Sequence, residues 1–217
     1  MGQSGNLVAM IDPEFFKTLE RHRPDPVLAP GPPRRFVTIE ADLRRWSFDQ
    51  ADLSCSDFPG CDFSSCSMRE VDLYAANCVA AQFVGADLGG AWLAKADFAH
   101  ADFTNAKLWR VRAMRAAFHN AVFVGAEFVS AELAKASFSS ANLRGARLIC
   151  CDLARCVLDG AKVRDLDLSG STGLDSIVCE ELDIGTGEVP EILSGISARR
   201  WLTAKAAASS EKAGRSP

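Results

Sequence analysis

The chain has 217 residues and a formal net charge of −4, and 48% of its residues are hydrophobic, which fits one ordinary globular domain. No apolar run approaches the ~18 residues of a membrane-spanning helix, and the opening residues MGQSGNLVAM lack the pattern of a secretory signal. The eight cysteines form no C-x-x-C pair of zinc spacing. We therefore expect free thiols, a reducing cytoplasmic location and no membrane partner.

The first predicted element is a short helix over residues 12–20. Asp12 can cap it, Pro13 suits the first helical position, and Glu14 follows early in the first turn. Residues 22–35, HRPDPVLAPGPPRR, predict an extended, proline-rich linker. We assign residues 1–40 to this helix, linker and cap.

From residue 41 to residue 170 the apolar residues repeat every five positions, a spacing that fits neither a helix nor a strand. In GADLGGAWLAKADFAHADFTNAKL, a small residue and, two positions later, a large apolar residue return every five positions. The large position recurs without insertion from Leu43 to Leu168, which makes 26 units. A helix would repeat its apolar face every 3.6 residues and a strand every 2. The pattern instead predicts short strands joined by bends and wound into a solenoid, whose coils stack at ~4.8 Å.

The units ADLGG, ADFAH, ADFTN and ANLRG resemble the A(D/N)Lxx units of the pentapeptide-repeat family. The resemblance implies an all-β fold, a right-handed quadrilateral β-helix with four units per coil, and short helical or irregular caps. The 26 units then make 26/4 = 6.5 coils, and the rod rises roughly 31 Å. Residues twenty apart are expected to stack.

After Gly170 the pattern ends, and the last predicted element is a helix from about Val189 to Ala208, weakened by Gly195. We expect residues 171–217 to form a C-terminal cap, or a dimerisation helix, with a disordered tail. A cap would cover strand edges that otherwise recruit other chains. The family resemblance favours a homodimer through this end, and both roles stay open.

The sequence offers little catalytic chemistry. Stacking brings His100 near His119, but outward polar side chains on a solenoid wall are usually only solvated. No G-x-S-x-G, P-loop, H-E-x-x-H or G-x-G-x-x-G motif occurs. We expect no enzyme, no cofactor, no metal and no small-molecule substrate. Four cysteines take small inward positions and are expected to be core thiols: Cys61, Cys66, Cys151 and Cys156.

The outer walls carry the candidate binding residues, in columns that follow the twenty-residue stacking. An alternating ladder of charges, which we expect to be structural, runs through Asp87, Lys107, Glu127, Arg147 and Asp167. A basic ridge consists of Lys95, Arg115, Lys135 and Arg155. An apolar stripe consists of Trp109, Val129 and Ile149. Two stacked acidic pairs are Asp42 with Asp62 and Asp52 with Asp72.

Two functions from different classes fit these columns. The family resemblance implies a DNA mimic that binds a type II topoisomerase, DNA gyrase or topoisomerase IV, and protects it from topoisomerase poisons, which gives antibiotic resistance. DNA carries one negative charge per ~1.7 Å, or roughly 18 over 31 Å, whereas residues 41–170 hold 16 acids against 14 bases. The acids concentrate in residues 42–102, ten against four bases. The alternative is a scaffold or adaptor that binds a protein through the apolar stripe and basic ridge. Direct nucleic-acid binding is not expected, because the net charge is negative.

Overall fold

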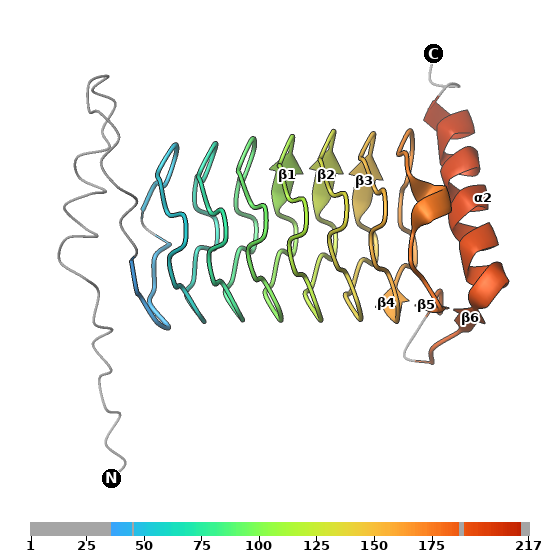
Figure 1. The fold of residues 1–217 in the computed structure, drawn as a ribbon, viewed down its shortest axis with the longest axis horizontal. Helices are drawn as coiled ribbons and strands as arrows, with labels where there is room; N and C mark the ends of the chain where they lie inside the picture. The colour runs from blue at the N-terminus through green and yellow to red at the C-terminus, as the bar shows by residue number, and fades with distance from the viewer. Residues whose placement is uncertain (1–35, 45, 187–188, 214–217) are drawn as a thin grey trace, which may run out of the picture.

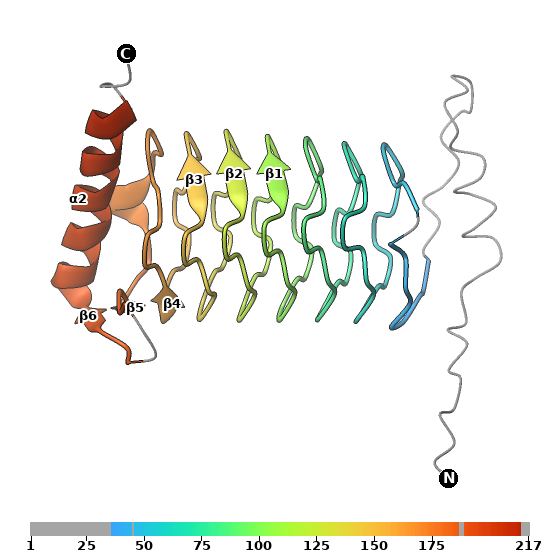
Figure 2. The same cartoon turned by 180° about the vertical axis from the view of Figure 1, so that it is seen from behind.

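The computed structural model describes residues 36–44, 46–186 and 189–213. Over this range the chain winds into a row of stacked coils, and a helix, α2, lies across the far end of the row (Figure 1). The view from behind shows the same regular stacking (Figure 2). The helix predicted at 12–20 and the linker at 22–35 lie outside the described residues. Within the described ranges, no helix is long and apolar enough to cross a membrane.

The coils repeat every twenty residues. Parallel bridges join residues twenty apart, from Val37 with Asp57 to Asp152 with Thr172. This register confirms four five-residue units per coil. Three longer strands follow the same register and form one parallel sheet in the order β1-β2-β3: β1 (Lys107–Trp109), β2 (Glu127–Val129) and β3 (Arg147–Ile149).

Backbone hydrogen bonds between coils run along the length of the row. The N–H of Asp62 donates to the carbonyl of Ala41 at 2.8 Å, and the carbonyl of Asp62 accepts the N–H of Leu43 at 2.9 Å. The same two bonds recur at the middle residue of successive units. Each coil therefore satisfies the backbone of its neighbour, which a single coil could not do alone.

Each unit ends at a turn residue in the left-handed region. Lys95, Arg115 and Lys135 have φ of 61°, 61° and 64°, a conformation that residues other than glycine rarely adopt. The turn is held because the turn residue's N–H bonds to the next coil, as from Lys95 to the carbonyl of Met114 at 3.1 Å. The side chain of this residue then points away from the core, and all three are exposed.

The core consists of columns of large residues beside columns of small residues, and it confirms the predicted column of Phe103 and Phe123 next to that of Ala101 and Ala121. Phe103 and Phe123 stack with their ring centroids 4.9 Å apart and 5° between the ring planes, and Phe83 stacks on Phe103 at 4.8 Å. A second aromatic column packs edge to face against the first, and neighbouring alanines fill the narrow side. The buried residues of this second column and of the alanine column are Phe98, Phe118, Phe138, Ala101, Ala121 and Ala141.

The register lengthens by one residue after Thr172. Val157 pairs with Val178, twenty-one positions away, because a short 3-10 helix, η1 (Leu174–Ser176), takes up the extra residue. Gly173 begins it with φ of 77°, and a Cβ there would lie 2.5 Å from a backbone nitrogen of the preceding coil. Glycine is required at this position for both reasons.

The C-terminal segment covers the last coil. A small three-stranded sheet has the order β4 (Ala161–Lys162), β5 (Glu181–Asp183), β6 (Ile192–Ser194), and β6 is antiparallel to β5. The helix α2 follows and spans Gly195–Ala213. Ala198 and Leu202 of α2 are fully buried. The helix predicted from Val189 in fact begins at Gly195, because residues 192–194 pair with β5 and Gly195 turns the chain with φ of 53°.

Candidate functional site

The apolar stripe lies on the β1–β3 sheet. Trp109, Val129 and Ile149 pair in register across the three strands, so the structure brings these three predicted residues together. The indole of Trp109 is 43% exposed, and its Nε1–H donates to Glu127 Oε2 at 3.2 Å. Val129 and Ile149 are half-buried. The stripe is a continuous apolar surface held on a hydrogen-bonded backbone.

A surface hollow opens beside Trp109, where the preceding coil has Gly89 and Gly90 in place of larger residues. The hollow has a volume of about 690 Å³. An ion pair between Arg147 and Glu127, at 2.9 Å, lies on its rim. We call this feature the Trp109 hollow, and its lining residues are Glu70, Gly89, Gly90, Trp109, Arg110, Glu127, Val129, Ser130 and Arg147. An apolar floor with a charged rim suits a large side chain of a partner protein.

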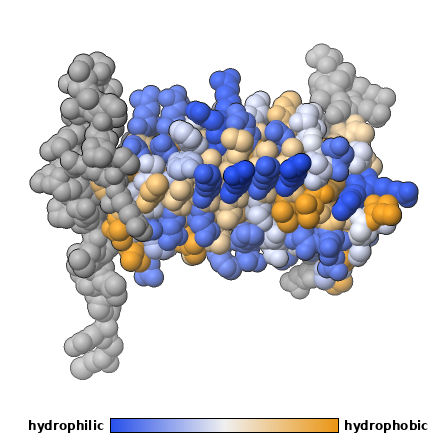
Figure 3. Space-filling model, in the orientation of Figure 1, coloured by the Kyte–Doolittle hydropathy of each residue, from blue (hydrophilic) through white to orange (hydrophobic). Residues whose placement is uncertain are grey.

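The basic ridge follows one line of turns. Lys95, Arg115, Lys135 and Arg155 are all exposed turn residues with positive φ. Lys95 Nζ donates to the hydroxyl of Tyr74 at 2.7 Å, but no ion pair joins the other three side chains to any residue in the described ranges. On the face seen in Figure 3, a row of strongly hydrophilic residues crosses successive coils beside hydrophobic patches. The ridge is present, and its binding role stays a prediction.

The two acidic pairs stack as expected, but their surroundings differ. Asp42 bridges to Asp62, and Asp52 to Asp72, in parallel register. The Arg44 guanidinium contacts both carboxylates of the first pair, Asp42 at 2.8 Å and Asp62 at 3.2 Å. Burial, and then the charge of Asp52, raises the pKa of Asp72. Within the described ranges no ion pair of 4 Å or less joins Asp52 or Asp72 to a base, although the charge of Arg112 acts on Asp72.

Sequence reasoning missed an aromatic cluster on the wall of Asp52 and Asp72. The rings of Tyr74 and Trp92 meet edge to face at 5.6 Å. Arg112 lies over Trp92 at 5.5 Å, and Lys95 lies over Tyr74 at 5.1 Å. Trp92 is 41% exposed. Counting by twenty from Asp72 to Trp92 to Arg112 would have revealed the cluster.

The thiols lie mainly in the core. All eight cysteines are free, and only Cys55 and Cys150 are exposed. Burial raises the pKa of Cys66 and of Cys151 to about 11, which makes these thiols poor nucleophiles. Within the described ranges, no three His, Cys, Asp or Glu side chains could hold a metal together.

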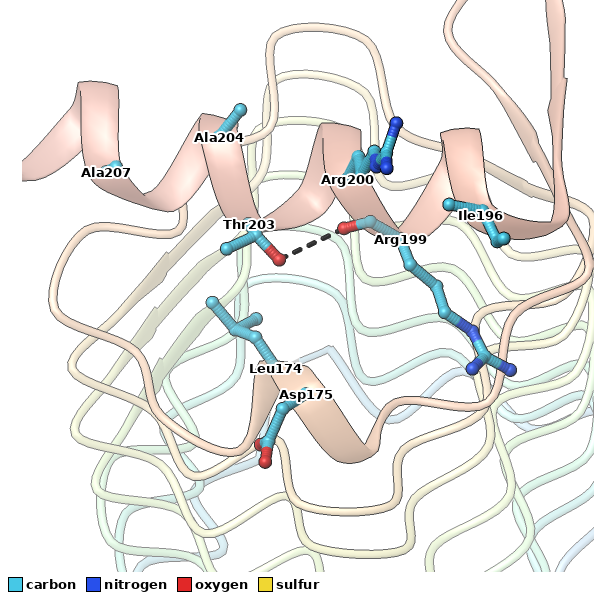
Figure 4. A pocket seen from close by; sticks show the side chains of 8 residues that line it. All are labelled: Leu174, Asp175, Ile196, Arg199, Arg200, Thr203, Ala204 and Ala207. Atoms are coloured by element: carbon cyan, nitrogen blue, oxygen red, sulfur yellow. Dashed lines mark hydrogen bonds between the residues drawn. The ribbon is translucent and has the colours of Figure 1, made fainter.

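A second hollow lies at the C-terminal end, between η1 and α2 (Figure 4). Leu174 of η1 faces Thr203 of α2, whose hydroxyl donates to the carbonyl of Arg199 at 3.1 Å. Ile196, at the edge of this groove, is 71% exposed. The groove lies at the end where the sequence predicts a dimer, and that dimer stays a prediction.

Solved structures with similarity to this chain include one, QnrB1, that shares its fold. A trypsin-treated variant of QnrB1, a plasmid-mediated fluoroquinolone resistance protein, is 23% identical, with a TM-score of 0.59, over 70% of this chain and 83% of its own. A pentapeptide repeat protein of the Arabidopsis thaliana thylakoid lumen is 26% identical over 48% of this chain and 66% of its own, with a TM-score of 0.35. HetL, involved in heterocyst differentiation regulation in the cyanobacterium Nostoc, is 19% identical over 70% and 89%, with a TM-score of 0.24.

The comparison with curated proteins gave no match. The family model for pentapeptide repeats matches eight copies, over residues 41–77, 81–116, 114–148 and 136–172. Members of this family fold as β-helices, in agreement with the twenty-residue register of the coils. The matched residues make up more than half of the chain, and the chain belongs to the pentapeptide repeat family.

Proposed function

We propose that the chain is a right-handed, four-sided β-helix that acts as a non-catalytic protein-binding rod, with the Trp109 hollow as its docking site. The observation that carries this proposal is a 43% exposed tryptophan on a hydrogen-bonded sheet, beside a glycine-lined hollow. Tryptophan and arginine are enriched among the residues that dominate protein–protein binding energy. A wall of paired strands needs no ordering on binding, so little entropy is lost there.

The rim of the hollow favours a partner with one large apolar side chain surrounded by polar groups. Val129 and Trp109 supply the apolar floor, and the Arg147–Glu127 ion pair borders it. Arg110 adds an exposed cation at the edge. A partner's carboxylate beside its apolar anchor would then meet Arg110.

Quantitative affinity capture from the native host tests this site. Trp109→Ala combined with Ile149→Ser is expected to lower recovery of the specific partner at least tenfold, because it removes the tryptophan of the floor and one side chain of the adjoining apolar stripe. Val178→Ser changes a side chain that is 49% exposed elsewhere on the rod and serves as the matched control. Equal recovery with both variants would refute docking at the hollow.

A second candidate is the DNA mimic that binds a type II topoisomerase in the cytoplasm and protects it from poisons. The stacked acidic pairs support this reading, and so does the fold likeness to QnrB1. The Arg44 clamp on Asp42 and Asp62 weakens it, because it neutralises part of one pair. Of the two stacked pairs, Asp52 with Asp72 would then contribute more of the DNA-like charge.

A gyrase supercoiling assay with and without a quinolone separates the two candidates. If the chain is a DNA mimic, changing Asp52, Asp62 and Asp72 to Lys should abolish its effect on gyrase supercoiling. The effect of the parent chain should also weaken as the salt concentration rises. The Trp109→Ala, Ile149→Ser variant should behave as the parent in this assay. No effect of the parent on gyrase or topoisomerase IV at micromolar protein would leave only the adaptor.

We also propose a homodimer through the C-terminal end. Its support is the apolar groove between η1 and α2, with Ile196 exposed at the edge. Ile196→Glu should convert a dimer to a monomer in light scattering without unfolding the rod, since this side chain makes no core contact. A parent that is monomeric at high concentration would refute the dimer.

A further inference from the structure

One wall of the rod reverses its charge halfway along four successive coils. Residues 50–55 and 70–75 carry three acids and no base, namely Asp52, Glu70 and Asp72. Residues 90–95 and 110–115 carry four bases and no acid, namely Lys95, Arg110, Arg112 and Arg115. Bridges from Asp52 through Asp72 and Trp92 to Arg112 place these segments in one stack on one wall. We call this surface the bipolar wall.

We propose that the bipolar wall binds a second copy of this chain, packed antiparallel about a twofold axis. The axis crosses the rod between segments 70–75 and 90–95. Segment 50–55 of one copy then faces segment 110–115 of the other, and segment 70–75 faces segment 90–95. A twofold axis lying in the plane of contact keeps each lateral position opposite itself, so Asp52 faces Arg112. Acidic coils meet basic coils at both ends of the contact.

The same pairing matches large side chains with small ones. Tyr74 packs against Trp92 and accepts a hydrogen bond from Lys95 of its own copy, and Ala94 between these two residues is nearly buried. The long cations face small residues, which gives them space to reach the acids beside them. The matched pairs are Glu70 with Gly90, Ala75 with Lys95, and Cys55 with Arg115, and Asp72 faces Trp92 near the axis. Complementary size and charge arise together from one symmetry operation.

The contacts within each copy engage the cations of this wall only in part, since Arg112 lies over Trp92 at 5.5 Å and Lys95 bonds to the Tyr74 hydroxyl. Arg112 and Arg115 form no ion pair within the described ranges, although Glu132 follows Arg112 on the next coil. Near the axis, Trp92 is 41% exposed and meets Tyr74 edge to face. The dimer would cover both aromatic clusters at its centre and place the ion pairs around them, which is the usual layout of a protein interface.

The footprint is short, so the association should be weak and sensitive to salt. Four coils at about 4.8 Å span roughly 14 Å from the first to the last, which is below the size of a standard stable interface. We expect a dissociation constant of ~10–100 µM at low salt and loss of the dimer at about 0.5 M salt. The proposal does not rest on the proposed function.

Charge-swapped variants test the pairing directly by sedimentation velocity at ~100 µM protein and low salt. Both variants, and the reference chain, carry Ile196→Glu so that the C-terminal groove cannot contribute. One variant reverses the acidic coils (Asp52→Lys with Asp72→Lys), and the other reverses the basic coils (Arg112→Glu with Arg115→Glu). Each variant alone should be monomeric, because like charges then face each other at both ends. Mixing the two should restore the dimer, since both ends are complementary again.

A cysteine pair tests the register. Arg115→Cys in a Cys150→Ser background places a thiol opposite Cys55 of the second copy, and mild oxidation should give a covalent dimer on a denaturing gel. Lys135→Cys in the same background, one coil further along, should give much less. A reference chain that stays monomeric at low salt, a variant mixture that does not associate, or equal cross-linking at both positions would overturn the proposal.

Discussion

Phe123 lies at the centre of the stacked core, and its truncation is the most direct test of that core. The side chain is fully buried. Its ring stacks on Phe103 at 4.9 Å and meets Phe118 and Phe138 edge to face at 5.3 Å and 5.6 Å. Phe123→Ala removes these contacts and leaves a cavity that fixed coils above and below cannot close.

The expected cost follows from burial and ring contacts. Truncation of a buried phenylalanine costs ~3–5 kcal/mol, and each aromatic pair adds ~0.5–1.5 kcal/mol beyond area burial. We expect about 4–5 kcal/mol, toward the upper end of the range, because Phe123 takes part in several ring pairs. For a chain of this size, this corresponds to a melting temperature lower by roughly 8–20 °C.

Thermal unfolding followed by circular dichroism measures this effect. Phe123→Leu is the matched control, because Leu143 occupies the same column one coil further on and is equally buried. This variant should lose only about 1–1.5 kcal/mol, since it keeps most of the buried volume. A melting temperature of Phe123→Ala equal to that of the parent, or to that of Phe123→Leu, would refute the assigned column.

Other substitutions and reagents test the small positions, the thiols and the end of the rod. Ala121→Leu should cost about 1–3 kcal/mol in urea unfolding, because the coil width is fixed by its neighbours; a parent-like midpoint would contradict this. At pH 8 a thiol reagent should label Cys55 and Cys150 of the native protein rapidly, whereas burial raises the pKa of Cys156 to about 12; rapid labelling of all eight would count against the core. Gly173→Ala should lower the melting temperature, because its Cβ would lie 2.5 Å from a backbone nitrogen at φ of 77°; an unchanged melt would show that the one-residue slip is tolerant.

The repeated part of the fold could be predicted because one small set of contacts recurs in every unit. Counting by five identified inward residues such as Phe123 and Ala121, and counting by twenty identified stacked pairs such as Asp42 with Asp62. These relations depend on backbone register, which the period of the sequence determines. The same counting also places Trp92 beside Asp72, because the two residues are twenty positions apart.

The two ends of the fold and the side-chain contacts could not be predicted in this way, because they depend on local interactions that the five-residue period does not specify. The packing begins at Phe36 and Thr38, both buried, where the small-then-large order is broken. Arg44 had two carboxylates within reach, and only side-chain geometry shows that it contacts both. At the C-terminal end, residues 192–194 gain more from pairing with β5 than from extending α2, so the helix starts late.

The direction of the coil-to-coil hydrogen bonds has a mechanical consequence. These bonds, such as those that join Asp62 to Ala41 and Leu43, lie along the rod. The covalent chain, by contrast, runs around each coil before it passes to the next. A force applied at the two termini would therefore peel one coil at a time instead of shearing the whole rod. Each event would release twenty residues, or roughly 70 Å of contour length at about 3.5 Å per residue. In an optical trap the rod would extend as a ladder of nearly equal steps, interrupted where the Phe83, Phe103 and Phe123 rings must be unstacked.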